Sequence, residues 1–184
     1  MIVKHIPMNS IKKSSFAGLV TYITNAQDKQ ERVGFVSVTN CHQLEASDAV
    51  LEVMATQAQN TRALSDKNYH MLISFRAGEK PDQKTLRAIE SRICAGLGYG
   101  EHQRVSAVHH DTDNLHIHVA VNKIHPTRHT IHEPYYDYKI LGQLCEKLEI
   151  EYSLERDNHI SQKRGAENRA EDMEHNAGIE SLLA

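Results

Sequence analysis

The sequence lacks any apolar run long enough to cross a bilayer, and its N-terminus has no signal-peptide pattern. We therefore expect no membrane insertion. Cysteine is scarce: Cys41, Cys94 and Cys145 are widely spaced and form no CxxC pair. This spacing argues against a disulfide scaffold and a cysteine zinc site, and it fits a reducing cytoplasm. Internal repeats and low-complexity tracts are also absent, and 184 residues suffice for one domain with a core and a peripheral extension.

An excess of basic residues, the usual mark of a nucleic-acid-binding protein, is missing as well. The net charge is −3, of which residues 150–184 contribute −4 and residues 1–149 contribute +1. Net charge alone therefore does not indicate DNA binding, and any electrostatic affinity for DNA must come from local basic patches. The residues that could form such patches are Lys4, Lys12, Lys13, Arg104, Lys123, Arg128 and Lys139.

Histidine, by contrast, is abundant and unevenly placed. Seven of the 13 histidines fall between residues 109 and 132. Residues 104–108 alternate like a strand, the Asp-Thr-Asp-Asn sequence at 111–114 is typical of a turn, and apolar residues alternate again after Leu115. The sequence therefore predicts a β-hairpin that carries the densest group of histidines.

This hairpin is a candidate metal site. Side chains in a strand alternate with a period of two, so His116 and His118 point to the same face, and folding the hairpin back brings His109 towards them. Three imidazoles beside acidic residues select a divalent metal and leave positions open for substrate. Asp111 or Asp113 could orient a ligand imidazole. The alternative is that the two histidines of the HxH sequence are surface or structural residues.

The remaining patterns predict an alternation of strands and helices. Besides the hairpin, we expect strands at residues 2–8, 33–41 and 69–75, and helices that begin near Phe16, Ser47, Asp82 and Asp137. The resulting order is β-α-β-α-β-α-β-β-α. It predicts a two-layer or three-layer α/β sandwich, in the α+β class, with an antiparallel or mixed sheet.

Polar residues predict how the helices begin. Ser14-Ser15 precedes an apolar stripe and supplies a serine N-cap, and Asp82 and Asp137 cap the later helices. In the helix that begins near Ser47, the residues expected to face inwards are Val50, Leu51, Met54 and Ala58. After residue 154 the chain becomes polar, and we expect a main domain of residues 1–154 followed by a peripheral helical extension of residues 155–184.

Two further residues are candidates for chemistry. Ser74 shares a strand face with His70 and could bind a phosphate, although no Gly-x-Ser-x-Gly elbow surrounds it, which argues against a serine hydrolase. Tyr22 lies at the border of an apolar helix face, where packing explains it as well as catalysis does. Spacing alone does not select a nucleophile from among the tyrosines, and the other six are Tyr69, Tyr99, Tyr135, Tyr136, Tyr138 and Tyr152.

Taken together, three segments resemble the three ordered motifs of conjugative relaxases, the plasmid-nicking enzymes of the HUH endonuclease superfamily. An early helix carries Tyr22, and a central strand carries Ser74. The third motif, HxDxxNxHxHxxxN, is matched by His109, Asp111, Asn114, His116, His118 and Asn122. The likeness covers essentially the whole chain and is greatest for the P-type mobilisation branch, close to the relaxase of IncP-type plasmids. Because such relaxases extend further, we expect this chain to be the N-terminal relaxase domain of a larger protein.

The resemblance implies an HUH relaxase fold, with a central antiparallel sheet flanked by helices and related to the palm-like, ferredoxin-like sandwich. It implies that Tyr22 attacks a scissile phosphate at the origin of transfer and leaves a 5′-phosphotyrosine link and a free 3′-hydroxyl. His116, His118 and His109 would hold Mg²⁺ or Mn²⁺, although a glutamate elsewhere could replace His109. Asp111 or Asp113 would orient a ligand imidazole, and one histidine would help to deprotonate the phenol.

The resemblance also implies partners. Single-stranded origin-of-transfer DNA would be contacted by Ser74, Asn122, Lys123 and Arg128. Accessory origin-binding proteins and the coupling protein of a type IV secretion system would act with the enzyme. The protein would reside in the bacterial cytoplasm, and its DNA-linked form would be translocated to the recipient cell.

Three other functions stay open at this point. A rolling-circle replication initiator uses the same chemistry, but initiators that resemble this group place the HUH motif before the tyrosine, whereas Tyr22 precedes His116. A non-catalytic, metal-stabilised module that binds single-stranded DNA predicts that Tyr22→Phe leaves every activity intact. A metal hydrolase that uses activated water predicts a free 5′-phosphate and no covalent protein–DNA adduct.

Overall fold

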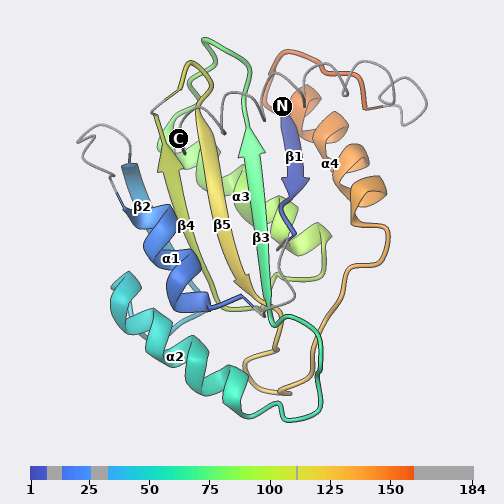
Figure 1. Ribbon diagram of the computed structural model, residues 1–184. Coiled ribbons are helices and arrows are strands. Elements are labelled where there is room, and N and C mark those ends of the chain that lie inside the picture. Colours follow the sequence, from blue (N-terminus) through green and yellow to red (C-terminus); the bar gives the residue numbers. More distant parts are fainter. Residues whose placement is uncertain (8–13, 26–32, 111, 160–184) are drawn as a thin grey trace, which may run out of the picture.

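The computed structural model describes residues 1–7, 14–25, 33–110 and 112–159. In chain order, its elements are β1 (Ile2–His5), α1 (Phe16–Thr24), β2 (Val33–Thr39), α2 (Ala46–Ala58), β3 (Asn68–Ser74), α3 (Gln83–Gly96), β4 (Arg104–His109), β5 (His116–Asn122) and α4 (Asp137–Glu151). The described strands form one antiparallel sheet in the order β1-β3-β5-β4-β2, as Figure 1 shows. The predicted order of elements and the central antiparallel sheet are confirmed.

Helices cover both faces of this sheet, so the fold has three layers. One buried cluster joins α1 and α2 to the β4–β5 face through small side chains such as Ala107 and Ala120. A larger cluster joins α3 and α4 to the opposite face, where Ile73, Ile117 and Val119 are buried. In Figure 1, α1 lies in front of the sheet, α2 lies next to α1 at the lower left, and α3 lies behind the sheet. The hairpin β4–β5 therefore lies in the interior of the sheet.

Alternation along β3 decides which of its side chains meet which layer. Tyr69, Met71 and Ile73 are buried against α3 and α4. His70 and Ser74 therefore face the α1 side, because successive side chains in a strand point to opposite faces. The register supports this, since Ser74 pairs with His116 and cross-strand partners share a face. The α1 side of the sheet thus collects polar and histidine side chains.

Helix α1 is fixed over this polar face by its cap and its apolar stripe. Ser15 has extended backbone, and its hydroxyl accepts a hydrogen bond from the Gly18 N–H (3.2 Å). Phe16, Val20 and Ile23 are buried at i, i+4 and i+7. The predicted serine N-cap and stripe are confirmed.

We expect Ser15→Ala to destabilise the protein by about 1 kcal/mol, because the N-cap hydroxyl satisfies a backbone N–H that has no partner within the helix. The free energy of unfolding from urea titration measures the loss. Ser47→Ala is the matched control, since Ser47 lies in the first turn of α2, whose N-cap has no side-chain hydrogen bond. Equal destabilisation by the two substitutions would contradict the capping role.

The prediction for the inward face of α2 was wrong for Leu51, Met54 and Ala58, whereas Val50 is half-buried and packs against the core as predicted. The buried residues are Ala49 and Val53, whereas Leu51 and Met54 have 67% and 48% of their surface exposed. Helix α2 packs on α1 and β2 through a stripe that includes small residues, and its larger side chains lie outside that stripe. The helix ends at Ala58.

The start of α4 also differs from the prediction, whereas the Asp82 cap of α3 is confirmed by its bond to the Thr85 N–H (2.8 Å). The N-cap of α4 is Tyr136, with left-handed backbone (φ 53°), and Asp137 lies in the first turn. The Asp137 carboxylate instead accepts a hydrogen bond from the Tyr69 hydroxyl (2.9 Å). This acid therefore links α4 to β3.

The segment after α4 is attached to the sheet where it is described. Asp157 accepts a hydrogen bond from the Arg76 guanidinium (2.6 Å), and Glu149 lies 2.9 Å from His159. Residues 155–159 are not helical, and most of the extension predicted as helical, residues 160–184, lies outside the described residues. Within the described residues, no helix has the length and apolar character needed to cross a membrane.

Candidate active site

The predicted histidine cluster exists and lies on the face of the hairpin covered by α1. His109 at the end of β4 pairs with His116 at the start of β5, and His118 follows on the same face. One ligand atom from each ring lies within 4.8 Å of the other two. This is the only such cluster of metal-ligating side chains within the described residues. His109 and His118 are buried and His116 is half-buried, so the triad opens to solvent at His116.

Backbone carbonyls orient two of these rings. The Nε2–H of His109 donates to the carbonyl of Ile23 (2.6 Å), one of the last carbonyls of α1, which have no partner inside the helix. The Nδ1–H of His116 donates to the carbonyl of Asn114 in the hairpin turn (2.9 Å). Because a carbonyl can only accept, the lone pair of each neutral ring lies on the other nitrogen. Neutral imidazoles whose free lone pairs are oriented in this way are suitable ligands for a first-row divalent cation.

A fourth histidine contacts the triad. Nε2 of His70 lies 2.9 Å from Nδ1 of His118, and the two rings are stacked with their centroids 5.2 Å apart. Burial lowers the pKa of His70 to about 4, so this imidazole is neutral near neutral pH. Sequence reasoning placed His70 on the same strand face as Ser74 but gave it no role.

Tyr22 lies over the triad. Its ring meets that of His118 edge-on, with the centroids 5.8 Å apart and the planes at 90°, and it lies 6.3 Å from His70. The tyrosine is 45% exposed. Since its neighbour Ile23 is buried and also binds His109, the end of α1 is held against the histidines. The ring of Tyr22 therefore contacts the histidine cluster and is also exposed to solvent.

The remaining predicted residues divide into two groups. Ser74 lies directly opposite His116 in the β3–β5 register, so the structure brings it to the triad. Asp113 is exposed in the turn of the hairpin, and Asp111 lies outside the described residues. Two carbonyls and His70 lie within hydrogen-bond distance of the ligand rings, and a role for either acid stays a prediction.

Three predicted DNA-binding residues lie at or beyond the other end of the hairpin: Asn122 ends β5, and Lys123 and Arg128 follow it. Asn122 has no exposed surface, and its amide donates to Gln103 (3.0 Å). Lys123 is 7% exposed and pairs with Glu133 (3.0 Å). Both side chains therefore have partners inside the protein, and their contact with DNA stays a prediction. The side chain of Arg128 is 66% exposed, and its contact with DNA stays a prediction.

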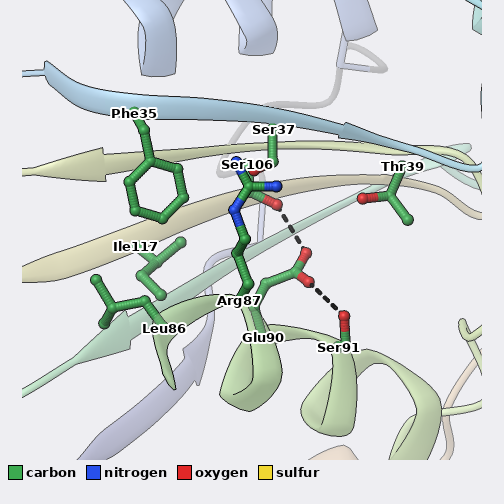
Figure 2. Close-up of a pocket in the computed structure, with 9 residues that line it drawn as sticks. All are labelled: Phe35, Ser37, Thr39, Leu86, Arg87, Glu90, Ser91, Ser106 and Ile117. Atoms are coloured by element: carbon green, nitrogen blue, oxygen red, sulfur yellow. Dashed lines mark hydrogen bonds between the residues drawn. The ribbon is translucent and has the colours of Figure 1, made fainter. Parts of the chain in front are cut away.

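A polar cavity of about 240 Å³ lies on the opposite face of the sheet, between β2 and α3. Figure 2 shows Glu90 from α3 bonded to Ser106 of β4, with Arg87 beside the Phe35 ring. Arg104, predicted as part of a basic surface patch, is instead buried, and its Nε donates to Glu90 (2.7 Å). Because the sheet separates this cavity from the triad, the cavity is not part of the candidate active site.

A histidine triad on the central hairpin of an antiparallel sheet, with a tyrosine from a separate helix above it, defines a DNA-nicking enzyme of the HUH type. Comparison with known families gives the same class. The relaxase family described as "MobA/VirD2-like, nuclease domain" matches residues 22–154. The chain belongs to this family, and it is therefore a conjugative relaxase nuclease domain.

Individual relatives agree with this assignment. Two proteins of Escherichia coli, each named "Protein TraI", are 65% and 67% identical to the chain over 183 residues, which is 100% of the chain. Those residues are only 24% and 25% of the two relatives, so the chain spans about a quarter of their length. "Protein MobA" of Acidithiobacillus ferrooxidans is 36% identical over 73 residues, 40% of this chain and 18% of the relative.

Proposed function

We propose that Tyr22 is the nucleophile of a reversible transesterification at a nick site in single-stranded origin-of-transfer DNA. The Tyr22 oxygen forms a bond to phosphorus, the bond from phosphorus to the 3′-oxygen breaks, and the proton lost by the phenol is balanced by the one gained at the 3′-hydroxyl. One phosphoester replaces another, so the 3′-hydroxyl can later attack the link and rejoin the strand. The observation that carries the proposal is the position of the exposed Tyr22 ring over His118, at a centroid distance of 5.8 Å.

The triad fits the divalent ion that this chemistry needs. His109, His116 and His118 would hold Mg²⁺ or Mn²⁺, with the remaining positions left for water and phosphate oxygens. Such an ion neutralises charge on the non-bridging phosphate oxygens.

Residues around the triad would hold the DNA. Ser74, opposite His116, would donate a hydrogen bond to a phosphate oxygen near the nick. Arg128 is exposed and would contact the backbone of the strand. Since residues 1–149 carry a net charge of only +1, base-specific contacts and accessory origin-binding proteins would supply much of the affinity.

The proposal extends to the transfer of the nicked strand between cells. The DNA-linked protein would be passed by the coupling protein of a type IV secretion system to the recipient cell. There, the reverse reaction would close the transferred strand.

The direct test of the function is a denaturing gel with two labels on the same origin oligonucleotide. With Mg²⁺ or Mn²⁺, we expect a 3′-end label to move into a protein-sized band and a 5′-end label to appear in a shorter free strand. EDTA should prevent both changes. An excess of free strand that ends in a 3′-hydroxyl should reverse the reaction and release the DNA from the protein. Cleavage that leaves both labelled fragments free of protein would instead identify a nuclease that uses activated water.

A further inference from the structure

One ring nitrogen of His118 lies within hydrogen-bond distance of an imidazole from outside the triad. The partner atom of His109 is the carbonyl of Ile23, and that of His116 is the carbonyl of Asn114. His118 Nδ1 instead lies 2.9 Å from His70 Nε2. His70 comes from β3, a strand that contributes no member of the triad, and it pairs in the sheet with Ala120, two residues beyond His118.

We propose that His70 is a positioning residue that fixes the tautomer and orientation of His118 for binding the divalent cation. This inference rests on the metal-binding role proposed above for the triad. The lone pair of His70 Nε2 accepts the Nδ1–H of His118, which places the lone pair of His118 on Nε2. Ring stacking at 29° with a centroid separation of 5.2 Å restrains rotation of the same imidazole.

The geometry explains why an acceptor is needed at this position. A neutral imidazole carries its proton on either nitrogen, and only the unprotonated nitrogen binds a cation. The two carbonyls resolve this choice for His109 and His116 because they cannot donate. His118 is 6% exposed, so water is a poor substitute for a fixed acceptor there.

The choice of imidazole also affects the charge of the site. A carboxylate at this position would orient His118 equally well and would add a negative charge beside the cation. His70 provides the acceptor without that charge. His70 itself therefore adds no negative charge beside the cation that would bind the phosphate.

The experiment compares His70→Leu with His70→Gln by isothermal titration of Mn²⁺ into the folded, DNA-free protein. Glutamine offers an oxygen close to the position of Nε2, whereas leucine fills space and offers no acceptor. We expect His70→Leu to weaken Mn²⁺ binding by about 10–100-fold, as loss of such a partner does elsewhere. His70→Gln should stay within about threefold of the unaltered protein, since it keeps the hydrogen bond.

His42→Leu is the matched control, because the side chain of His42 is 95% exposed and the same exchange there should leave Mn²⁺ binding unchanged. Unaltered binding in folded His70→Leu would overturn the proposal. Equal losses in His70→Leu and His70→Gln would also overturn it, because the acceptor would then be irrelevant. His116→Ala tests the premise separately: if it binds Mn²⁺ as the unaltered protein does, the metal role of the triad fails, whatever the His70 variants do.

Discussion

Tyr22→Phe is expected to abolish the covalent protein–DNA adduct while leaving the fold and the binding of single-stranded DNA unchanged. The substitution removes only the phenolic oxygen, and the ring keeps its edge-on contacts with His70 and His118. Loss of a nucleophile removes the reaction route itself, so adduct formation should fall by at least about 10³-fold. Gel quantification of the 3′-labelled adduct at saturating Mn²⁺ measures the effect.

Tyr135→Phe is the matched control for this experiment. Tyr135 is 83% exposed and precedes α4. The substitution Tyr135→Phe therefore removes the same phenolic oxygen, but at the surface of the protein. It should leave adduct formation within about twofold of the unaltered protein, as expected for an exposed residue outside the site. Residual adduct at a wild-type rate in Tyr22→Phe would assign the nucleophile to another residue.

Glu90→Ala is expected to destabilise the protein by about 3–5 kcal/mol, because it leaves a buried guanidinium without its counter-charge. The side chains of Glu90 and Arg104 are 8% and 3% exposed, and their ion pair is 2.7 Å long. The Glu90 carboxylate also accepts a hydrogen bond from Ser106 (2.7 Å) and thereby links α3 to β4. Urea unfolding followed by circular dichroism measures the change.

The surface pair Arg92–Glu151 provides the comparison. It joins α3 to α4 at 2.9 Å, but both side chains are nearly half exposed. Glu151→Ala should cost less than about 1 kcal/mol, because solvent screens exposed pairs. A similar loss of unfolding free energy in both variants would contradict the prediction, because burial of the Glu90–Arg104 pair would then not increase its contribution to stability.

The features predicted correctly from the sequence are those encoded over short stretches of chain. The period of two around His116 and His118 and the turn residues before them specify a hairpin, and a hairpin necessarily returns His109 towards the pair. The apolar stripe of α1 likewise required only eight residues, Phe16 to Ile23. Since the motif and the elements that carry it are local, the triad and its fold were accessible from the sequence.

The features that were missed depend on contacts between distant segments. The bond from His70 to His118 requires the register between β3 and β5, across 48 positions of sequence. Asn122 is buried and bonded to Gln103, the residue just before the neighbouring strand β4, so a polar residue that matched a motif proved to be part of the core. In α2, the choice between Leu51 and Val53 as the buried side chain was decided by packing against α1. No single-strand or single-helix pattern contains this information.

The most direct test of the central claim is mass spectrometry of the adduct after nuclease trimming and trypsin digestion. Cleavage after Lys13 and Lys29 yields a peptide of residues 14–29 whose only tyrosine is Tyr22. The account predicts that this peptide carries the added mass of a 5′-phosphorylated nucleotide, located on Tyr22 by fragmentation. An unmodified 14–29 peptide, with the nucleotide on another tyrosine or on none, would contradict it.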